Sequence, residues 1–333
     1  MTSAVTRFYV MHGIRARVDW SAEVLPAVEA ILEYHGFAET EASGDIDWFA
    51  RLDRGGRRPF VPTMRGAAAD PQTGLRIFRQ GSTLYIAGDD AVAVVSNDEQ
   101  LVLWISDDIA ADRSRLPPIL YFVLTFALLG LLQRRAMFAV HGAALGLDES
   151  RGLLLIGESD TGKSTLAMTL VRSGWRYLSD DSIFLCPNGD DPIEAIPFRR
   201  DFGFDADAEV LFPELRETSE SQLTDARKRR VRVDALYPLQ YMERCIPRVI
   251  VFPTVAPSEA SRVSPIRPTD ALRRLMTQSS FVDMDAELAR NQMDVLQRTI
   301  RQCRCLALVA GADLKGVPEA ADALLRPLLE APA

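Results

Sequence analysis

Eight residues in the middle of the chain have the types and the spacing of a loop that binds phosphate. Residues 157–164, GESDTGKS, match the pattern G-x-x-x-x-G-K-[ST]. Glycines let the backbone approach a polyphosphate closely, and the helix that follows such a loop turns its positive end toward the anion. The pattern predicts that Lys163 contacts the β- and γ-phosphates and that Ser164 binds Mg²⁺. The candidate nucleotide-binding residues are Gly157, Glu158, Ser159, Asp160, Thr161, Gly162, Lys163, Ser164 and Thr165.

Two adjacent carboxylates, Asp180 and Asp181, follow the next apolar segment at residues 175–179. Adjacent residues on a strand point to opposite faces, so we expect one carboxylate to face the metal or the acceptor hydroxyl and the other to face the protein. Phosphoryl transfer needs charge neutralisation by Mg²⁺ and a cation, and an aspartate that accepts the hydroxyl proton. Beside a phosphate loop, the pair therefore predicts phosphotransfer chemistry, whereas alone it would indicate a solvated turn.

The segments around the loop have the pattern of an α/β domain that would position it. Residues 153–156 form a short apolar run before the loop, and apolar residues at helical spacing follow it until Gly174. A second strand candidate, residues 138–147, carries His141. Alternating strands and helices favour an α/β nucleotide-binding domain, with the acidic and basic region 205–234 as an exposed excursion. Further strands are expected at residues 183–186, 193–198, 248–252 and 306–310, and further helices at residues 269–278, 285–302 and 318–329.

The N-terminal residues have a different pattern. We expect strand structure at residues 6–18 and 46–52, a helix from Ser21 to Tyr34, and a long loop at residues 55–74. Two hairpins are predicted after it, one pairing residues 75–78 with 84–87 and one pairing residues 91–95 with 101–105. This pattern predicts a small α+β domain at residues 1–110, a polar linker at residues 107–115, and a catalytic domain at residues 111–333.

Residues 116–132 are apolar enough to be confused with a membrane span. The segment is shorter than the roughly 20 residues that a bilayer requires, and Pro117 and Pro118 suit the first turn of a buried helix. We therefore expect a core helix and no membrane attachment.

Composition excludes several further classes. The net charge of -8 gives the surface no general attraction for nucleic acid or anionic lipid. The N-terminus has no signal-peptide pattern, and the four cysteines contain no C-x-x-C pair, so a cytoplasmic protein is expected. We expect Cys303 and Cys305 to mark the end of a helix that runs into a strand.

The segment that contains His141-Gly142, GESDTGKST and SGWRYLSDD resembles the C-terminal catalytic domain of the HPr serine kinase/phosphorylase family, whose fold is similar to that of phosphoenolpyruvate carboxykinase. The resemblance covers residues 137–184. It implies a P-loop domain of that type, with His141 as active-site histidine and Lys163 as phosphate ligand. It also implies Ser164 as Mg²⁺ ligand, Asp181 as proton acceptor and Asp180 as its neighbour on the metal side.

The chain departs from that family at several places. Asp160 and Thr161 replace small residues in the loop, and Thr165 stands where bifunctional members carry glutamate. The family has a further acidic metal ligand whose segment has no clear counterpart in this sequence. Glu194 and Asp201 are the two candidates for that ligand. Arginines among residues 199–200 and 227–232 are candidates for a clamp on the substrate or the transition state, against the alternative of solvated charge. These departures indicate a diverged member.

The sequence therefore predicts an ATP- and Mg²⁺-dependent kinase that transfers the γ-phosphoryl group to a hydroxyl, most simply serine, of a small protein, a peptide or a free metabolite. Some diverged members are similar to kinases that act on lasso-type precursor peptides or on free serine, so the acceptor stays open. The resemblance also suggests an oligomer. One alternative is a nucleotide-binding regulatory protein with little catalysis. Another is a carboxykinase-like enzyme, which would need an arginine pocket for a carboxylate. The choice between ATP and GTP stays open.

Overall fold

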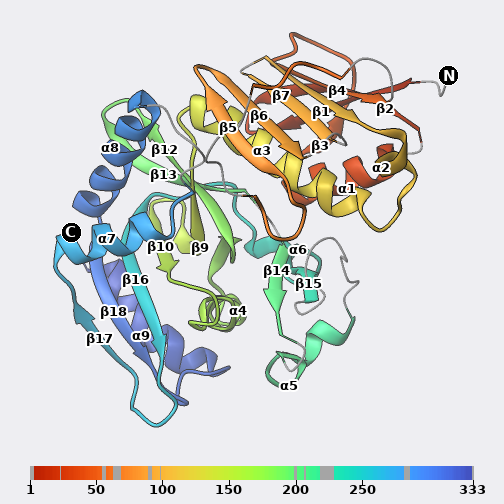
Figure 1. The fold of residues 1–333 in the computed structure, drawn as a ribbon. Helices are drawn as coiled ribbons and strands as arrows, with labels where there is room; N and C mark the ends of the chain where they lie inside the picture. The colour runs from red at the N-terminus through yellow and green to blue at the C-terminus, as the bar shows by residue number, and fades with distance from the viewer. Residues whose placement is uncertain are drawn as a thin grey trace. The chain divides into compact units, whose positions relative to one another are not determined.

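The computed structural model has a mixed α/β fold with two large sheets, each in its own compact unit (Figure 1). It describes residues 4–22, 24–54, 58–62, 69–88, 92–97, 99–198, 201–205, 208–217, 229–280 and 286–331. One unit comprises residues 1–135 with residues 281–289, and the other comprises residues 136–280 and 290–333. The coarse α/β class predicted from the sequence is confirmed.

The N-terminal unit is built on an eight-stranded sheet with the order β3-β1-β2-β4-β8-β7-β6-β5. Alternate residues of β2 are buried, the two-residue period of a sheet with one covered face. Helices α1 and α3 pack against each other, and the buried His35 Nε2 lies 2.9 Å from Thr125 Oγ1 on α3. Its elements are β1 (Ala4–Met11), β2 (Ile14–Ser21), α1 (Leu25–Tyr34), β3 (Ala38–Thr40), β4 (Trp48–Arg54), β5 (Arg76–Gln80), β6 (Thr83–Gly88), β7 (Val92–Ser96), β8 (Gln100–Ile105), α2 (Asp107–Ala111) and α3 (Leu116–Arg134).

Most predictions for this unit are confirmed, with two corrections. Both hairpins form, as β5–β6 and β7–β8. The first helix begins later than predicted, because Ser21 is the last residue of β2 and pairs with β1. The expected linker is in part the helix α2, whose first turn is capped by Ser106 Oγ accepting from the Ile109 N–H at 3.4 Å. The predicted loop at residues 55–74 lies partly outside the described residues.

The apolar helix α3 belongs to the N-terminal unit. It contacts α1 and β6, and the division between the units therefore falls after Arg135 and not after residue 110. Within the described part of the chain, α3 is the one helix long and apolar enough to cross a membrane, by length and composition alone. The expectation of a core helix agrees with the 67% of its most apolar window that is buried.

The C-terminal unit contains a mixed sheet with the order β13-β12-β9-β10-β16-β18-β17, and β11 also pairs with β9. Strands β10, β16 and β18 are parallel neighbours, whereas β9 and β17 run antiparallel to theirs. Strand β17 is not among the strands predicted from the sequence. The strands are β9 (Phe138–Asp148), β10 (Arg151–Ile156), β11 (Arg176–Ser179), β12 (Ser182–Asn188), β13 (Asp191–Pro197), β14 (Asp201–Phe204), β15 (Arg229–Arg232), β16 (Pro247–Val255), β17 (Arg262–Pro265) and β18 (Arg304–Ala310).

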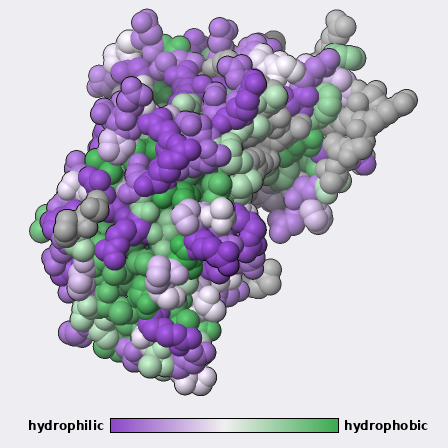
Figure 2. Space-filling view, turned by 90° about the vertical axis from the view of Figure 1, so that its left-hand side faces the viewer, coloured by the Kyte–Doolittle hydropathy of each residue, from purple (hydrophilic) through white to green (hydrophobic). Residues whose placement is uncertain are grey.

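Helices cover both faces of this sheet (Figure 1). Alternate residues of β10 divide between two cores: Leu153 and Leu155 face α4 and α9, and Leu154 and Ile156 face α7 and α8. Figure 2 shows apolar residues gathered over the lower part of the view, with polar residues around them. The helices are α4 (Lys163–Arg172), α5 (Ala208–Leu211), α6 (Val233–Leu236), α7 (Pro268–Thr277), α8 (Ala286–Gln302) and α9 (Pro318–Glu330), with 3-10 turns at Pro213–Glu217 and Pro238–Gln240.

The region expected to be an exposed excursion is partly buried. Its strand β15 forms an antiparallel ribbon with β14, which directly precedes the region. Phe202, Phe204 and Val231 on this ribbon are buried in the same core as α4, which explains why the ribbon stays close to the phosphate loop. The expected helix end at Cys303 is confirmed, since α8 ends at Gln302 and β18 begins at Arg304.

Candidate functional site

The candidate phosphate loop connects β10 to α4 and has two residues in the left-handed region. Asp160 has φ 64° and Gly162, the N-cap of α4, has φ 86°. Thr161 Oγ1 donates to the Glu158 carbonyl at 2.8 Å, which closes the tip of the loop. A Cβ on Gly157 would lie 3.0 Å from that Thr161 oxygen, so the glycine permits the tight turn. The backbone is thus shaped as a cradle at the positive end of α4.

Lys163 is buried under this loop and is 5% exposed. Its Nζ donates to the carbonyls of Gly157 and Glu158, each at 2.7 Å. The ammonium group is therefore held directly beneath the cradle. A polyphosphate seated in the loop would bring anionic oxygens to the same place, where a lysine acts as a point charge.

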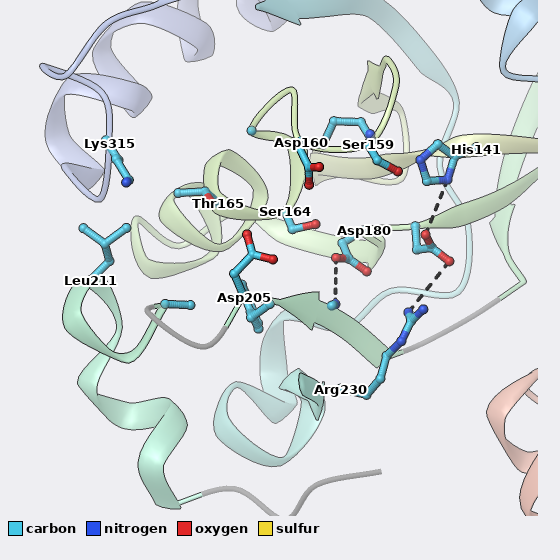
Figure 3. A pocket seen from close by; sticks show the side chains of 16 residues that line it. His141, Ser159, Asp160, Ser164, Thr165, Asp180, Asp205, Leu211, Arg230 and Lys315 are labelled. Carbon is cyan, nitrogen blue, oxygen red and sulfur yellow. Dashed lines mark hydrogen bonds and ion pairs between the residues drawn. The ribbon is translucent and has the colours of Figure 1, made fainter. Parts of the chain in front are cut away.

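A cavity of about 170 Å³ lies beside the loop (Figure 3). It brings together the loop, the two aspartates and His141, and it also receives residues from the β14–β15 ribbon and from the segment before α9. Its lining residues are His141, Ser159, Asp160, Gly162, Lys163, Ser164, Thr165, Asp180, Asp181, Gly203, Phe204, Asp205, Ala208, Leu211, Arg230 and Lys315.

Asp180 is the buried carboxylate of this cavity, at 2% exposure. Its Oδ2 accepts from the Gly203 N–H at 3.0 Å, whereas its Oδ1 is buried without a hydrogen-bond partner among the described residues. Burial, with the negative charge of Asp181, raises the pKa of Asp180 to about 6, and the Ser164 hydroxyl and Arg230 lower it in part. A cation bound between Asp180 Oδ1 and the Ser164 hydroxyl would supply the partner that this buried oxygen lacks among the described residues.

Asp181 lies between two side chains with nitrogen donors. Its Oδ1 is 3.4 Å from His141 Nδ1 and its Oδ2 is 3.8 Å from Arg230 NH1 (Figure 3). The pairing of β9 with β12 places His141 beside Asp181. His141 is opposite Ser182, and the Gly142 N–H donates to the Asp181 carbonyl at 3.0 Å. His141 Nε2 is buried without a hydrogen-bond partner among the residues described.

The aspartates are not placed as the sequence analysis expected. They lie in the turn between β11 and β12 and not on a strand, and both line the same cavity. The expectation of opposite faces is therefore wrong, although the two carboxylates do differ in burial and in partners. The Ser179 hydroxyl shapes this turn by accepting from the N–H groups of Asp181 and Ser182 at 3.3 and 3.2 Å.

Several candidate residues do not line the cavity. Gly157, Glu158 and Thr161 form the body of the loop behind it. Glu194 and Asp201 are not among the lining residues, and each faces an arginine: Glu194 faces Arg244 at 3.5 Å, and Asp201 faces Arg232 at 3.7 Å. The candidate arginines at 199, 200 and 227 lie outside the described residues.

The structure adds three residues that the sequence analysis did not single out for the site. Arg230 was only one member of a basic run, and Asp205 and Lys315 carried no local pattern at all. All three reach the cavity from segments that follow the loop at a distance along the chain. The alternating basic and apolar residues 230–233 are the signal in the sequence that one face of this segment is buried.

Neither a protein-family model nor a curated protein matches the chain. Among solved structures, the chain is similar to the Hpr(Ser) kinase/phosphatase from Coxiella burnetii. That likeness covers 57% of this chain and 94% of the other, at 14% identity and a TM-score of 0.29. It is a distant structural relationship only, and the assignment of the site rests on the geometry given above.

Proposed function

We propose that this chain is an ATP- and Mg²⁺-dependent kinase with a P-loop domain of the HPr kinase and phosphoenolpyruvate carboxykinase type. It transfers the γ-phosphoryl group to a hydroxyl, most simply serine, of a peptide, a small protein or a free metabolite. One observation carries the proposal: a single cavity is lined by Lys163 and Ser164 from the loop and by the paired carboxylates Asp180 and Asp181. Phosphoryl transfer needs this combination of a phosphate cradle, a cation site and a proton acceptor.

The residues present fit a magnesium ion. Among the described residues, no group of three or more His, Cys, Asp or Glu side chains is placed to hold a metal. Mg²⁺ in kinase sites is bound by one or two protein oxygens together with substrate phosphates and water, so a larger cluster is not needed. Asp180, whose Oδ1 has no hydrogen-bond partner among the described residues, and the Ser164 hydroxyl would hold it, and the ion would neutralise charge on the phosphates.

In this proposal, Asp181 accepts the proton of the acceptor hydroxyl. This carboxylate is partly exposed to the cavity, whereas Asp180 is buried, so an incoming hydroxyl can reach Asp181. His141 and Arg230 hold the carboxylate from two sides and fix its orientation. The Arg230 guanidinium also faces the cavity, where it can stabilise charge on the transferred group.

The test is transfer of labelled γ-phosphate from ATP to serine-containing peptides and to free serine, with and without Mg²⁺. We expect Asp181→Asn to keep its affinity for ATP and to lose transfer by about 10²–10⁴-fold, the usual contribution of a general base. Lys163→Met removes the charge beneath the loop, and we expect it to lose nucleotide binding. Arg267→Met removes an exposed positive charge that does not line the cavity, so it is the comparison variant.

The alternative is a nucleotide-binding regulator without transfer. It predicts normal ATP affinity, no labelled acceptor, and identical behaviour of the wild-type and Asp181→Asn proteins. A wild-type protein that shows no binding of ATP would contradict both functions.

A further inference from the structure

A second cavity, of about 330 Å³, borders the other side of the phosphate loop. It shares Asp160, Gly162, Thr165, Asp205 and Lys315 with the first cavity, so the two meet at the N-terminus of α4. None of His141, Asp180, Asp181 and Arg230 lines the second cavity. Figure 3 places Lys315 and His141 at opposite ends of the first cavity. Asp160 and Asp205 therefore lie where the two cavities meet, whereas the pair Asp180 and Asp181 lines the first cavity alone.

The second cavity has mainly apolar walls. Its side chains come from α4, from the end of β16 and from the segment after β18, and they include Leu166, Val255, Pro257 and Leu314. Val255 is a large apolar residue that is nevertheless 47% exposed, at the mouth of this cavity. An apolar cavity beside a phosphate cradle suits a flat aromatic heterocycle attached to the phosphates.

The backbone around this cavity offers little to read the edge of a base. The Gly311 N–H donates to Ser261 Oγ at 2.8 Å, and the Ala256 N–H donates to the Ala310 carbonyl at 2.9 Å. A Cβ on Gly311 would lie 2.0 Å from the Glu259 carbonyl, so the two segments pack closely at this glycine. The polar side chains that line this cavity all belong to the residues shared with the first cavity, and its other walls are apolar. Apolar walls discriminate weakly between analogues, whereas a hydrogen-bonding site discriminates strongly.

Lys315 lies where the two cavities meet. Its side chain forms no hydrogen bond or ion pair with the residues that the structure describes, and it lines both cavities. A cation at this position faces the phosphates nearest the nucleoside, on the side of the loop opposite Arg230.

We infer that the second cavity binds the purine nucleoside of the nucleotide, mainly by apolar contact and with little preference between adenine and guanine. This inference rests on the proposed function, because it takes the loop to bind a nucleoside triphosphate. It also gives the bound nucleotide a direction: the base lies against Val255 and Leu314, and the γ-phosphate points toward Asp181.

The test measures binding of ATP, GTP and inorganic tripolyphosphate to the full chain by calorimetry. Tripolyphosphate carries the phosphates without the nucleoside. Ala312 is an exposed residue of the cavity wall, so Ala312→Trp fills the cavity without disturbing the core. Val255→Asn removes apolar contact at the mouth. Val317→Asn makes the same change at a valine that is 39% exposed and lines neither cavity.

We expect Ala312→Trp and Val255→Asn to weaken ATP binding by about 5- to 20-fold, the equivalent of losing one apolar contact, and to leave tripolyphosphate binding within about twofold. Val317→Asn should change neither. ATP and GTP should bind the wild-type protein within about fivefold of each other.

Three outcomes would overturn the inference. These are an equal loss of ATP and tripolyphosphate in Ala312→Trp, no loss of either ligand, and a preference above about 100-fold for one purine. Wild-type protein that binds tripolyphosphate as tightly as ATP would also overturn it while leaving the phosphate loop in place. Failure to bind either ligand would instead contradict the proposed function.

Discussion

Asp181 Oδ1 lies 3.4 Å from His141 Nδ1, although 39 residues (181 minus 141, less one) separate them in the chain. The pairing of β9 with β12 brings the two together at one end of the cavity. Because the imidazole lies against one carboxylate oxygen and Arg230 against the other, the orientation of the carboxylate is fixed before a substrate binds. Such preorganisation lowers the cost of reaching the transition state.

His141→Gln removes the nitrogen that faces Asp181. We expect kcat to fall by about 10- to 100-fold with little change in the KM for ATP, because the loop and its lysine are untouched. Steady-state kinetics at saturating acceptor would measure this. His12, in the N-terminal unit at φ 48°, provides the comparison, and His12→Asn should leave both constants unchanged. A rise in KM alone would show that His141 contributes to binding and not to positioning.

Arg230→Lys tests whether the planar guanidinium is needed. Arg230 faces Asp181 across the cavity, whereas Arg232 on the same ribbon donates to Asp234 at 3.0 and 2.6 Å. Lysine keeps the charge but loses the fixed fork of donors, so we expect transfer to fall by about tenfold or more. Arg232→Lys is the matched variant and should retain most activity. Equal activity of the two variants in the transfer assay would contradict a role for Arg230 at the site.

The local pattern predicts the centre of the site but not its opposite wall. The loop at residues 157–165 lies within one strand, turn and helix, so its residue types and spacing determine its shape. Arg230, Asp205 and Lys315 come from distant segments, and only the packing of the β14–β15 ribbon and the placement of α9 bring them to the cavity.

The same distinction applies to the fold. The hairpins β5–β6 and β7–β8 were predictable because a turn joins neighbouring strands. Strand β17 was not, since its short sequence has little apolar character and it forms only by pairing with β18 at the edge of the sheet. The sequence pattern places Asp180 and Asp181 on a strand, whereas the structure has them in a turn. The apolar residues before them give no signal of where the strand ends.

Gly162→Ala and Gly174→Ala separate the stability of α4 from the function of the loop. The two glycines flank the helix with φ 86° and φ 91°, which alanine adopts at a cost of about 1–2 kcal/mol. A Cβ at Gly162 would lie 3.0 Å from Val255 Cγ2, whereas a Cβ at Gly174 would have no atom within 4 Å among the described residues. We expect both variants to unfold at lower urea concentration, and only Gly162→Ala to lose ATP affinity beyond about tenfold. Equal affinity of the two variants would mean that the loop tolerates the added carbon.

Asp180→Asn should make the nucleotide-free protein more stable at pH 7.5 and should reduce the stabilisation that Mg²⁺ with ATP provides. The folded protein raises the pKa of Asp180 to about 6, above the ordinary value of 3.8, because burial and Asp181 disfavour the charged form. The cost of ionising this carboxyl is therefore absent below about pH 4 and complete above about pH 6. Asparagine can still accept from the Gly203 N–H but carries no charge, so the free energy of unfolding should rise by about 1–3 kcal/mol at pH 7.5 and change little at pH 4.

Urea denaturation at both pH values would measure the difference. Mg²⁺ with ATP should stabilise the wild-type protein more than the variant. Lower stability of the variant at pH 7.5 would show that the carboxylate supports the fold and is not held there at a cost for the site.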